Sequence, residues 1–95
     1  GMSAILYVED DELTRQTVTN RLRRMGHEVT SVDSGEAALE AMDRTRPSLA
    51  LLDLELPGID GVQTLRQLRQ RIPNLPTVVC SAHLNEAFVR QQLSA

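Results

Sequence analysis

Four short segments with strand character alternate along the chain with segments whose apolar residues recur at helical spacing, and this alternation limits the possible folds more than any other feature. The strand-like segments are Ala4–Val8, Glu28–Val32, 49–52 and Thr77–Cys80, and the helical segments are 13–25, 33–42, 62–72 and 85–93. The first and third strand-like segments are apolar throughout, which is typical of strands buried on both faces. Strict alternation predicts an α/β domain with a parallel sheet covered by helices on both faces.

Local signals mark two of the helix boundaries. Asp33 stands three residues before Glu36, the spacing of a capping box, so the second helix is predicted to begin at Asp33. Gly26 is a natural end for the first helix, because glycine accepts the left-handed conformation that often terminates a helix. In the third helix, the face predicted to meet solvent carries Arg66, Arg69 and Arg71.

The composition of the 95 residues argues against several classes of function. A net charge of −3 argues against nonspecific binding of nucleic acid. Tyr7 and Phe88 are the only aromatic residues, so stacking on bases is not expected. A single cysteine, Cys80, excludes an internal disulfide and fits a reducing compartment. Because no apolar run approaches the roughly 20 residues of a membrane span, we expect a cytoplasmic protein.

Acidic and hydroxyl side chains stand where three of the predicted strands end. Glu9 and Asp10 follow the first strand, Asp53 ends the third, and Ser81 follows the fourth. In an open parallel sheet, functional residues gather outside the carboxyl ends of the strands. Three carboxylates that converge there would repel one another. A hard divalent cation such as Mg²⁺, which prefers oxygen ligands, would relieve that repulsion.

Each of these residues also has a purely structural explanation. The run from Glu9 to Glu12 could be the acidic first turn of a helix, complementing its dipole. Asp53 could cap a loop, and Ser81 could start a helix or a turn. Their coincidence at the ends of three separate strands favours the functional explanation.

Three motifs carry a resemblance to a known family. They are ILYVEDD at 5–11, LLDLELPGIDG at 51–61 and PTVVCSA at 76–82. The chain resembles a response-regulator receiver domain of two-component signalling over residues 2–95. The resemblance implies a flavodoxin-like three-layer sandwich whose parallel sheet has the strand order 2-1-3-4. It also implies a phosphoacceptor module, rather than a turnover enzyme, that takes a phosphoryl group from a histidine kinase and switches conformation to control an output.

Carried over residue by residue, the resemblance implies a role for each residue of the predicted site. Asp53 would be the phosphoacceptor, and Ser81 the switch hydroxyl that binds the phosphoryl group. Glu9 and Asp10 would organise Mg²⁺, with Asp10 as a direct ligand and Glu9 acting through water. The Asp53 carboxylate and the backbone carbonyl of Glu55 would complete the metal site.

The sequence departs from the family in one respect. Members continue into a fifth strand, which ends at a lysine that contacts the phosphoryl group, and a fifth helix. All ten basic residues other than histidine are arginine here, so this lysine is absent, and we interpret the chain as a C-terminally incomplete receiver. Without a fifth strand, the fourth would be an open edge, and such an edge invites self-association.

The expected partners are a cognate histidine kinase or phosphotransfer protein and an output domain in the full-length protein, without direct contact to nucleic acid or membrane. Two alternatives remain open. A pseudo-receiver would act only as a protein-interaction module because it lacks the lysine. A phosphatase would use Asp53 as a nucleophile, although Asp53-Leu54-Glu55 only approximates the Asp-x-Asp pattern of haloacid-dehalogenase-like enzymes.

Overall fold

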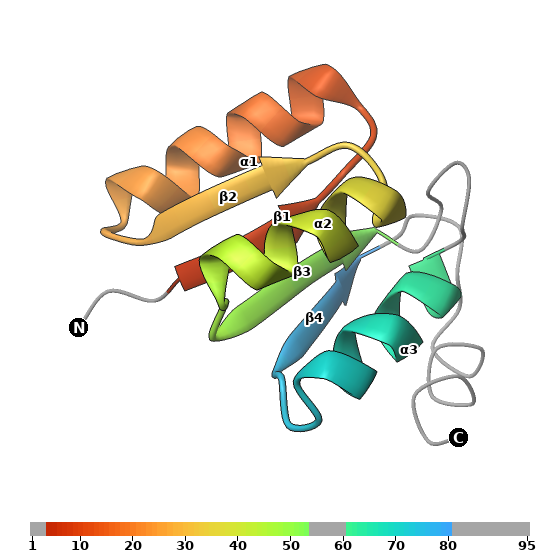
Figure 1. Ribbon diagram of the computed structural model, residues 1–95. Helices are drawn as coiled ribbons and strands as arrows, with labels where there is room; N and C mark the ends of the chain where they lie inside the picture. The colour runs from red at the N-terminus through yellow and green to blue at the C-terminus, as the bar shows by residue number, and fades with distance from the viewer. Residues whose placement is uncertain (1–3, 54–60, 81–95) are drawn as a thin grey trace.

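A parallel four-stranded sheet lies between two layers of helix (Figure 1). The computed structural model describes residues 4–53 and 61–80. Within them the elements are, in chain order, β1 (Ala4–Val8), α1 (Glu12–Arg24), β2 (Glu28–Val32), α2 (Gly35–Thr45), β3 (Leu49–Asp53), α3 (Gly61–Arg71) and β4 (Thr77–Cys80). The helix expected at 85–93 lies outside the described residues.

The strands are ordered β2-β1-β3-β4, and every pair is parallel. Val8 of β1 pairs with Val32 of β2 and with Leu52 of β3, so the three carboxyl ends stop at the same level. The predicted α/β class, the parallel sheet and the strand order are therefore confirmed. All described strands present their carboxyl ends at one edge of the sheet.

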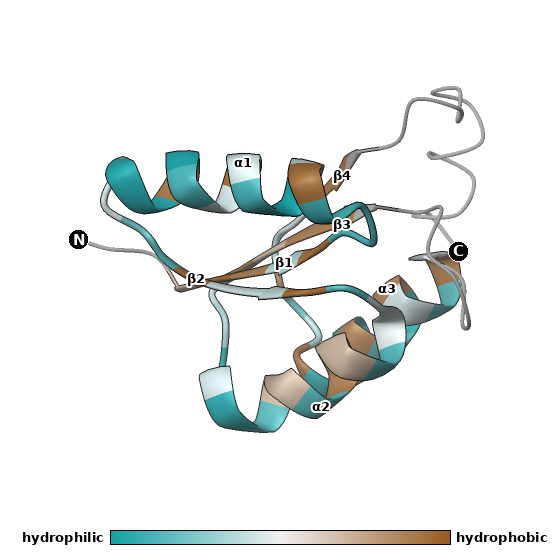
Figure 2. Cartoon of the chain, turned by 90° about the horizontal axis from the view of Figure 1, so that it is seen from above, coloured by the Kyte–Doolittle hydropathy of each residue, from teal (hydrophilic) through white to brown (hydrophobic). Residues whose placement is uncertain are grey.

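Alternate residues of the strands supply two separate apolar layers. Leu6, Val8 and Leu52 face α2 and α3, where they join the larger core cluster with Leu65 and Leu68. The opposite layer is smaller and lies under α1; its members are Ile5, Tyr7 and Val29, with Val18, Leu22, Leu49 and Leu51 packed against them. Figure 2 shows the sheet edge-on with α1 on one side and α2 and α3 on the other. Period-two alternation thus produces the three layers.

The outward positions of α1 include two of its large apolar side chains. Leu13 is 73% exposed, although it belongs to the helical pattern in the sequence. It lies five residues before Val18, which is about 140° around a helix, so it cannot share the face that Val18 turns to the sheet. Met25 is 65% exposed because it is the C-cap, beyond the last turn of the helix. Gly26, the predicted end of the helix, follows with a φ of 99°.

The prediction that Asp33 caps α2 is wrong by one residue. Ser34 is the N-cap, and its hydroxyl accepts a hydrogen bond from the Ala37 N–H at 3.1 Å. Ser34 is the last residue with extended backbone, at φ −153° and ψ 163°, and a cap needs that geometry for its oxygen to reach the first turn. The helix ends at Arg46, which adopts φ 43° before Pro47.

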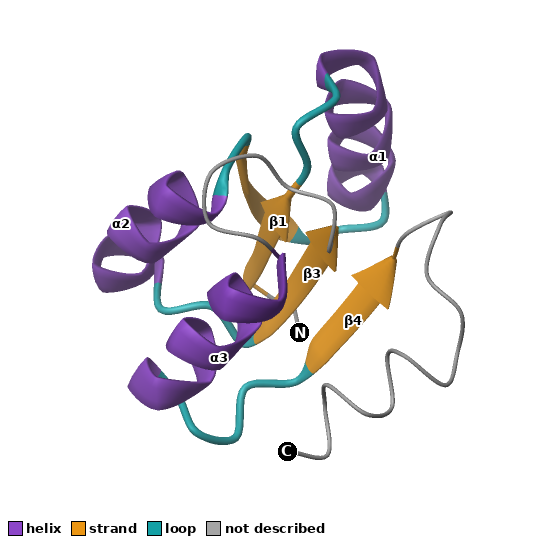
Figure 3. Ribbon diagram, turned by 90° about the vertical axis from the view of Figure 1, so that its right-hand side faces the viewer, coloured by secondary structure: helices purple, strands orange, loops and turns teal. Residues whose placement is uncertain are grey.

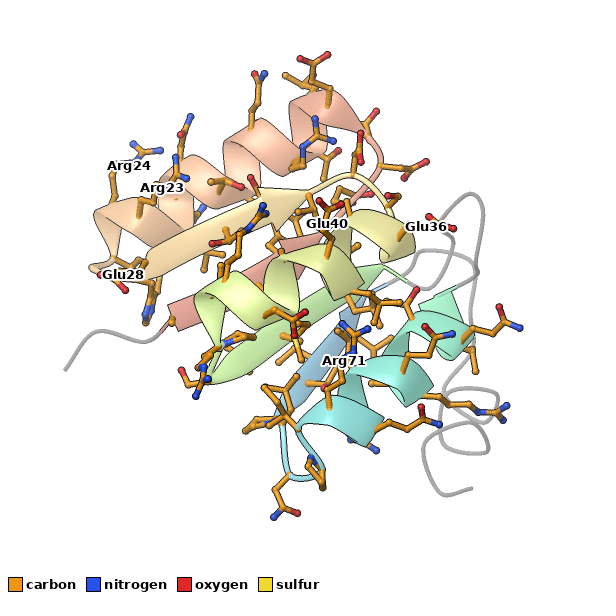
Figure 4. All side chains as sticks on the ribbon, viewed as in Figure 1. Arg23, Arg24, Glu28, Glu36, Glu40 and Arg71 are labelled. Atoms are coloured by element: carbon orange, nitrogen blue, oxygen red, sulfur yellow. The ribbon has the colours of Figure 1, made fainter. Side chains whose placement is uncertain are left out.

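One arginine of α3 does more than meet solvent. Arg71, predicted on the solvated face, donates from Nη1 to the main-chain carbonyl of Leu39 in the neighbouring helix. Figure 4 shows its side chain reaching from α3 towards α2. The guanidinium therefore links the two helices that cover the same face of the sheet. None of the helices in the described ranges is long and apolar enough to cross a bilayer.

Candidate functional site

The carboxyl edge of the sheet brings the predicted residues of β1 and β3 to one level. The Glu9 N–H donates to the Val32 carbonyl at 3.0 Å, which continues the pairing of β1 with β2 by one residue. Because Val8 pairs with Leu52, Glu9 lies beside Asp53, the last residue of β3. Asp53 in turn pairs with Cys80, the last residue of β4. The backbone thus places Glu9, Asp53 and Cys80 in a row across three neighbouring strands.

The two residues of the acidic pair differ in burial. Glu9 is only 9% exposed, and its Oε2 accepts a long hydrogen bond of 3.4 Å from the Asp11 N–H. Asp10 is exposed. A buried carboxylate requires polar partners, whereas an exposed one is free to exchange water for a ligand. The loop between β1 and α1 therefore offers one constrained and one accessible carboxylate.

In the acidic run from Glu9 to Glu12, the first two residues belong to the candidate site and the last two belong to the start of α1. Asp11 caps α1, because its Oδ2 accepts hydrogen bonds from the Thr14 N–H at 2.9 Å and from the Thr14 hydroxyl at 2.6 Å. These two bonds, with the nearby charge of Arg15, lower the pKa of Asp11 below its ordinary value. Glu12 lies in the first turn. The helix-dipole explanation therefore holds for Asp11 and Glu12, whereas Glu9 and Asp10 precede the helix.

Arg15 contacts the acidic pair and was missed by sequence reasoning. Its Nη1 donates to the Glu9 carbonyl at 2.9 Å and more weakly to the Asp10 carbonyl at 3.4 Å. One signal in the sequence could have found it. Arg15 stands in the first turn of α1, where the helix dipole disfavours a cation, so another partner for its charge was to be expected.

The edge is open to solvent next to Arg15. A shallow hollow of about 300 Å³ is lined by Arg15, Ser31, Val32, Asp33 and Ala37, at the carboxyl end of β2. Within residues 4–53 and 61–80, no group of three or more side chains is placed to hold a metal ion. The predicted third carboxylate, that of Asp53, is described by its backbone alone, and Glu55 and Ser81 lie outside the described residues.

A family model for the response regulator receiver domain matches residues 5–95. The chain belongs to this family. Phosphorylation and Mg²⁺ binding are general features of receiver domains. Glu9 is buried beside the end of β3, and Asp10 is accessible to solvent. Their carboxylates supply the oxygen donors that fit such an ion.

The receiver domain is similar to parts of longer regulators. FleR, a response regulator protein of Pseudomonas aeruginosa, is 42% identical over 79 residues, which make up 83% of this chain and 17% of FleR. AfsQ1, a transcriptional regulatory protein of Streptomyces coelicolor, is 40% identical over 88 residues, or 93% of this chain and 39% of AfsQ1. The chain spans less than half the length of either relative.

A solved structure agrees with this assignment. The N-terminal domain of a response regulator receiver protein from Methanoculleus marisnigri has a TM-score of 0.89 to this receiver domain at 28% sequence identity. The alignment covers 99% of this chain and 79% of that one. The flavodoxin-like sandwich implied by the three motifs is therefore the fold of the chain.

Proposed function

We propose that the chain is the phosphoacceptor receiver module of a two-component phosphorelay, in which Asp53 takes a phosphoryl group from a histidine kinase or phosphotransfer protein. The observation that carries the proposal is the register between β1 and β3: Val8 pairs with Leu52, so the backbones of Glu9 and Asp53 follow at neighbouring strand ends. Family membership supports the same function. The module would act in the cytoplasm and control an output domain of the full-length protein.

Each residue of the site would have a separate role in phosphoryl transfer. A carboxylate oxygen of Asp53 attacks the phosphorus of a phosphohistidine, so that a P–O bond forms as the P–N bond breaks and histidine leaves with the bonding pair. Glu9, Asp10, Asp53 and the Glu55 carbonyl would hold Mg²⁺, whose charge offsets that of the phosphoryl oxygens. The phosphoryl group brings nearly two negative charges in place of the single charge of the Asp53 carboxylate. The Ser81 hydroxyl would donate to a phosphoryl oxygen and so bias the conformation that the output domain senses.

Labelling with a small phosphodonor tests the proposal directly. With acetyl phosphate and Mg²⁺, the chain should gain one phosphoryl group, detected by intact mass spectrometry and located at Asp53 by borohydride trapping. EDTA and Asp53→Asn should each abolish labelling. Asp43→Asn, which changes an exposed aspartate of α2, should label normally. Undiminished labelling of Asp53→Asn would show that the phosphoacceptor is assigned wrongly.

The same labelling experiment tests a second function. A pseudo-receiver that serves only as an interaction module would fold with the same sheet and bind partners without phosphorylation. A folded chain that resists acetyl phosphate in the presence of Mg²⁺ would favour this second function.

A further inference from the structure

We infer that Arg15 is a positioning residue that fixes the backbone of the acidic pair in the arrangement needed to bind a divalent cation. The inference rests on the proposed function, because it concerns the same site. It starts from a single nitrogen, Nη1 of Arg15, which donates to the carbonyls of two consecutive residues, Glu9 and Asp10. The donor comes from α1 and both acceptors from the loop that precedes it.

By binding the carbonyls of Glu9 and Asp10, Arg15 restricts the direction in which the Asp10 side chain leaves the backbone. The Glu9 carbonyl belongs to the peptide plane before the Asp10 Cα atom, and the Asp10 carbonyl belongs to the plane after it. Because peptide groups are planar, orienting both planes restricts φ and ψ of Asp10. The direction of its Cα–Cβ bond is then restricted as well. Asp10 is exposed, so no packing of its own side chain would otherwise set that direction.

Other contacts hold the ends of the loop, and Arg15 binds its two middle carbonyls. At one end, the Glu9 N–H binds the Val32 carbonyl at 3.0 Å. At the other, Asp11 caps the helix through Thr14. Between them, Arg15 binds both carbonyls, and the Asp11 N–H makes a long bond of 3.4 Å to Glu9 Oε2. Among ligands of a metal, partners that orient the ligating groups matter nearly as much as the ligands themselves.

The positive charge of Arg15 lies where the helix dipole is unfavourable to it, and helix formation alone gives no reason for a cation at this position. Its main-chain N–H makes the first helical bond, to the Asp11 carbonyl at 2.8 Å, so its charge sits at the positive end of the helix dipole. The side chain is half-buried rather than extended into water. The bonds to the loop carbonyls offset this cost, and they orient the site as a consequence.

Arg23 offers a matched control on the same helix. Its Nη2 donates to the Val29 carbonyl at 3.0 Å, six residues away in sequence, as Arg15 is from Glu9. Figure 4 shows Arg23 at the end of α1 near Glu28, far from the carboxyl edge of the sheet. Arg23→Gln therefore removes a comparable arginine–carbonyl bond without touching the site.

The test compares Arg15→Gln, Arg15→Lys and Arg23→Gln with the wild type in a Mg²⁺ titration followed by amide NMR shifts. Arg15→Gln should raise the dissociation constant for Mg²⁺ at least tenfold, the usual effect of removing an orienting partner. Arg15→Lys, which keeps a charged donor, should recover part of the affinity. Arg23→Gln should bind Mg²⁺ as the wild type does. Urea midpoints in EDTA report any general loss of stability in each variant.

A metal-free measurement separates failure of this inference from failure of the proposed function. In EDTA, Arg15→Gln should speed hydrogen exchange at the Asp10 and Asp11 amides, whereas Arg23→Gln should leave both unchanged. If the wild type shows no Mg²⁺-dependent shift but the exchange result holds, the loop is positioned as described and the proposed metal site is wrong. Wild-type exchange and wild-type affinity in Arg15→Gln, or equal losses in Arg23→Gln, would overturn the role of Arg15.

Discussion

Three arginine side chains of this protein donate hydrogen bonds to main-chain carbonyls. Arg15, Arg23 and Arg71 each donate to a carbonyl of a different segment: the loop after β1, strand β2 and helix α2. A guanidinium has five donors on a rigid plane, so it can bind a buried carbonyl and still keep contact with water. A lysine offers a more compact and more strongly hydrated charge for the same task. The absence of lysine from the chain is consistent with this use of arginine.

The helix cap at Asp11 gives a prediction at the scale of one residue. The pKa of Asp11 is lowered from 3.8 mainly by hydrogen bonds from Thr14. An acid whose pKa falls on folding stabilises the native state at pH values above its unfolded pKa, and this contribution disappears as the pH falls through the lowered value. In EDTA, Asp11→Ala should therefore lower the urea midpoint at neutral pH, and the difference from wild type should shrink in acid.

Asp11→Asn completes this comparison. Asparagine caps helices about as well as aspartate but carries no charge. This variant should keep most of the wild-type midpoint at neutral pH. A gap between wild type and Asp11→Ala that stays constant from neutral pH to well below 3.8 would contradict the role of the charged cap.

From the sequence, only those site residues that lie at or directly after the end of a strand could be predicted. Glu9 and Asp10 follow an apolar strand, so their place at the carboxyl edge follows from the pattern alone. The division between Glu9 and Asp11 could not be predicted, because which acid caps the helix depends on where the backbone turns from extended to helical. The contact of Arg15 depends on a side chain folding back across that turn, which no periodicity encodes.

Strands were predicted more closely than helix ends, for a physical reason. The bounds of β1, β2 and β4 are as the sequence predicts, because continuous apolar runs or β-branched residues mark them. Asp53 extends β3 by one residue, since pairing with Cys80 continues past the apolar run. Ser34, rather than the predicted Asp33, caps α2. Both side chains suit an N-cap, so only the backbone conformation decides between them.

The packing of the helices gives a prediction at the scale of elements. Leu68 of α3 is fully buried in the larger core cluster. Leu68→Ala should lower the free energy of unfolding by about 2–5 kcal/mol, from lost burial and the cavity left behind. Leu13→Ala removes the same atoms from a side chain that is 73% exposed, and it should change stability by no more than about 0.5 kcal/mol. Urea melts of both variants check the pair, and equal losses would show that the assignment of faces is wrong.

At the scale of the whole molecule, the helices of residues 4–53 and 61–80 cover the two faces of the sheet unequally. Of these helices, α2 and α3 lie side by side over one face, whereas α1 lies over the other, away from β4 (Figure 3). Val78, on β4, is 51% exposed and pairs with the half-buried Leu51. Within the described ranges, β4 also has a neighbouring strand on one side only. Among the described residues, an exposed apolar side chain and an unpaired strand edge thus coincide on β4.

This coincidence leads us to expect self-association through the edge of β4. Sedimentation velocity over a range of concentrations should show a species larger than the monomer that grows with concentration. Val78→Lys, which places a charge on the edge strand, should return the protein to the monomer. Leu13→Lys, which changes an exposed apolar side chain of α1, should not. A wild type that remains monomeric at every concentration would contradict the expectation.

The strand order also governs how the chain can fold as it is made. Of the described strands, β1 is synthesised before the others although it is an interior strand of the sheet, and its partner β3 begins only at Leu49. The amide of Ser48 already binds the carbonyl of Ala4 across this span. A ribosome must therefore release β2, α2 and β3 before β1 has a strand on each side, and the loop that closes is long. Until then, the apolar β1 is exposed in the nascent chain, and in a crowded cell it is the segment that chaperones would be expected to bind first.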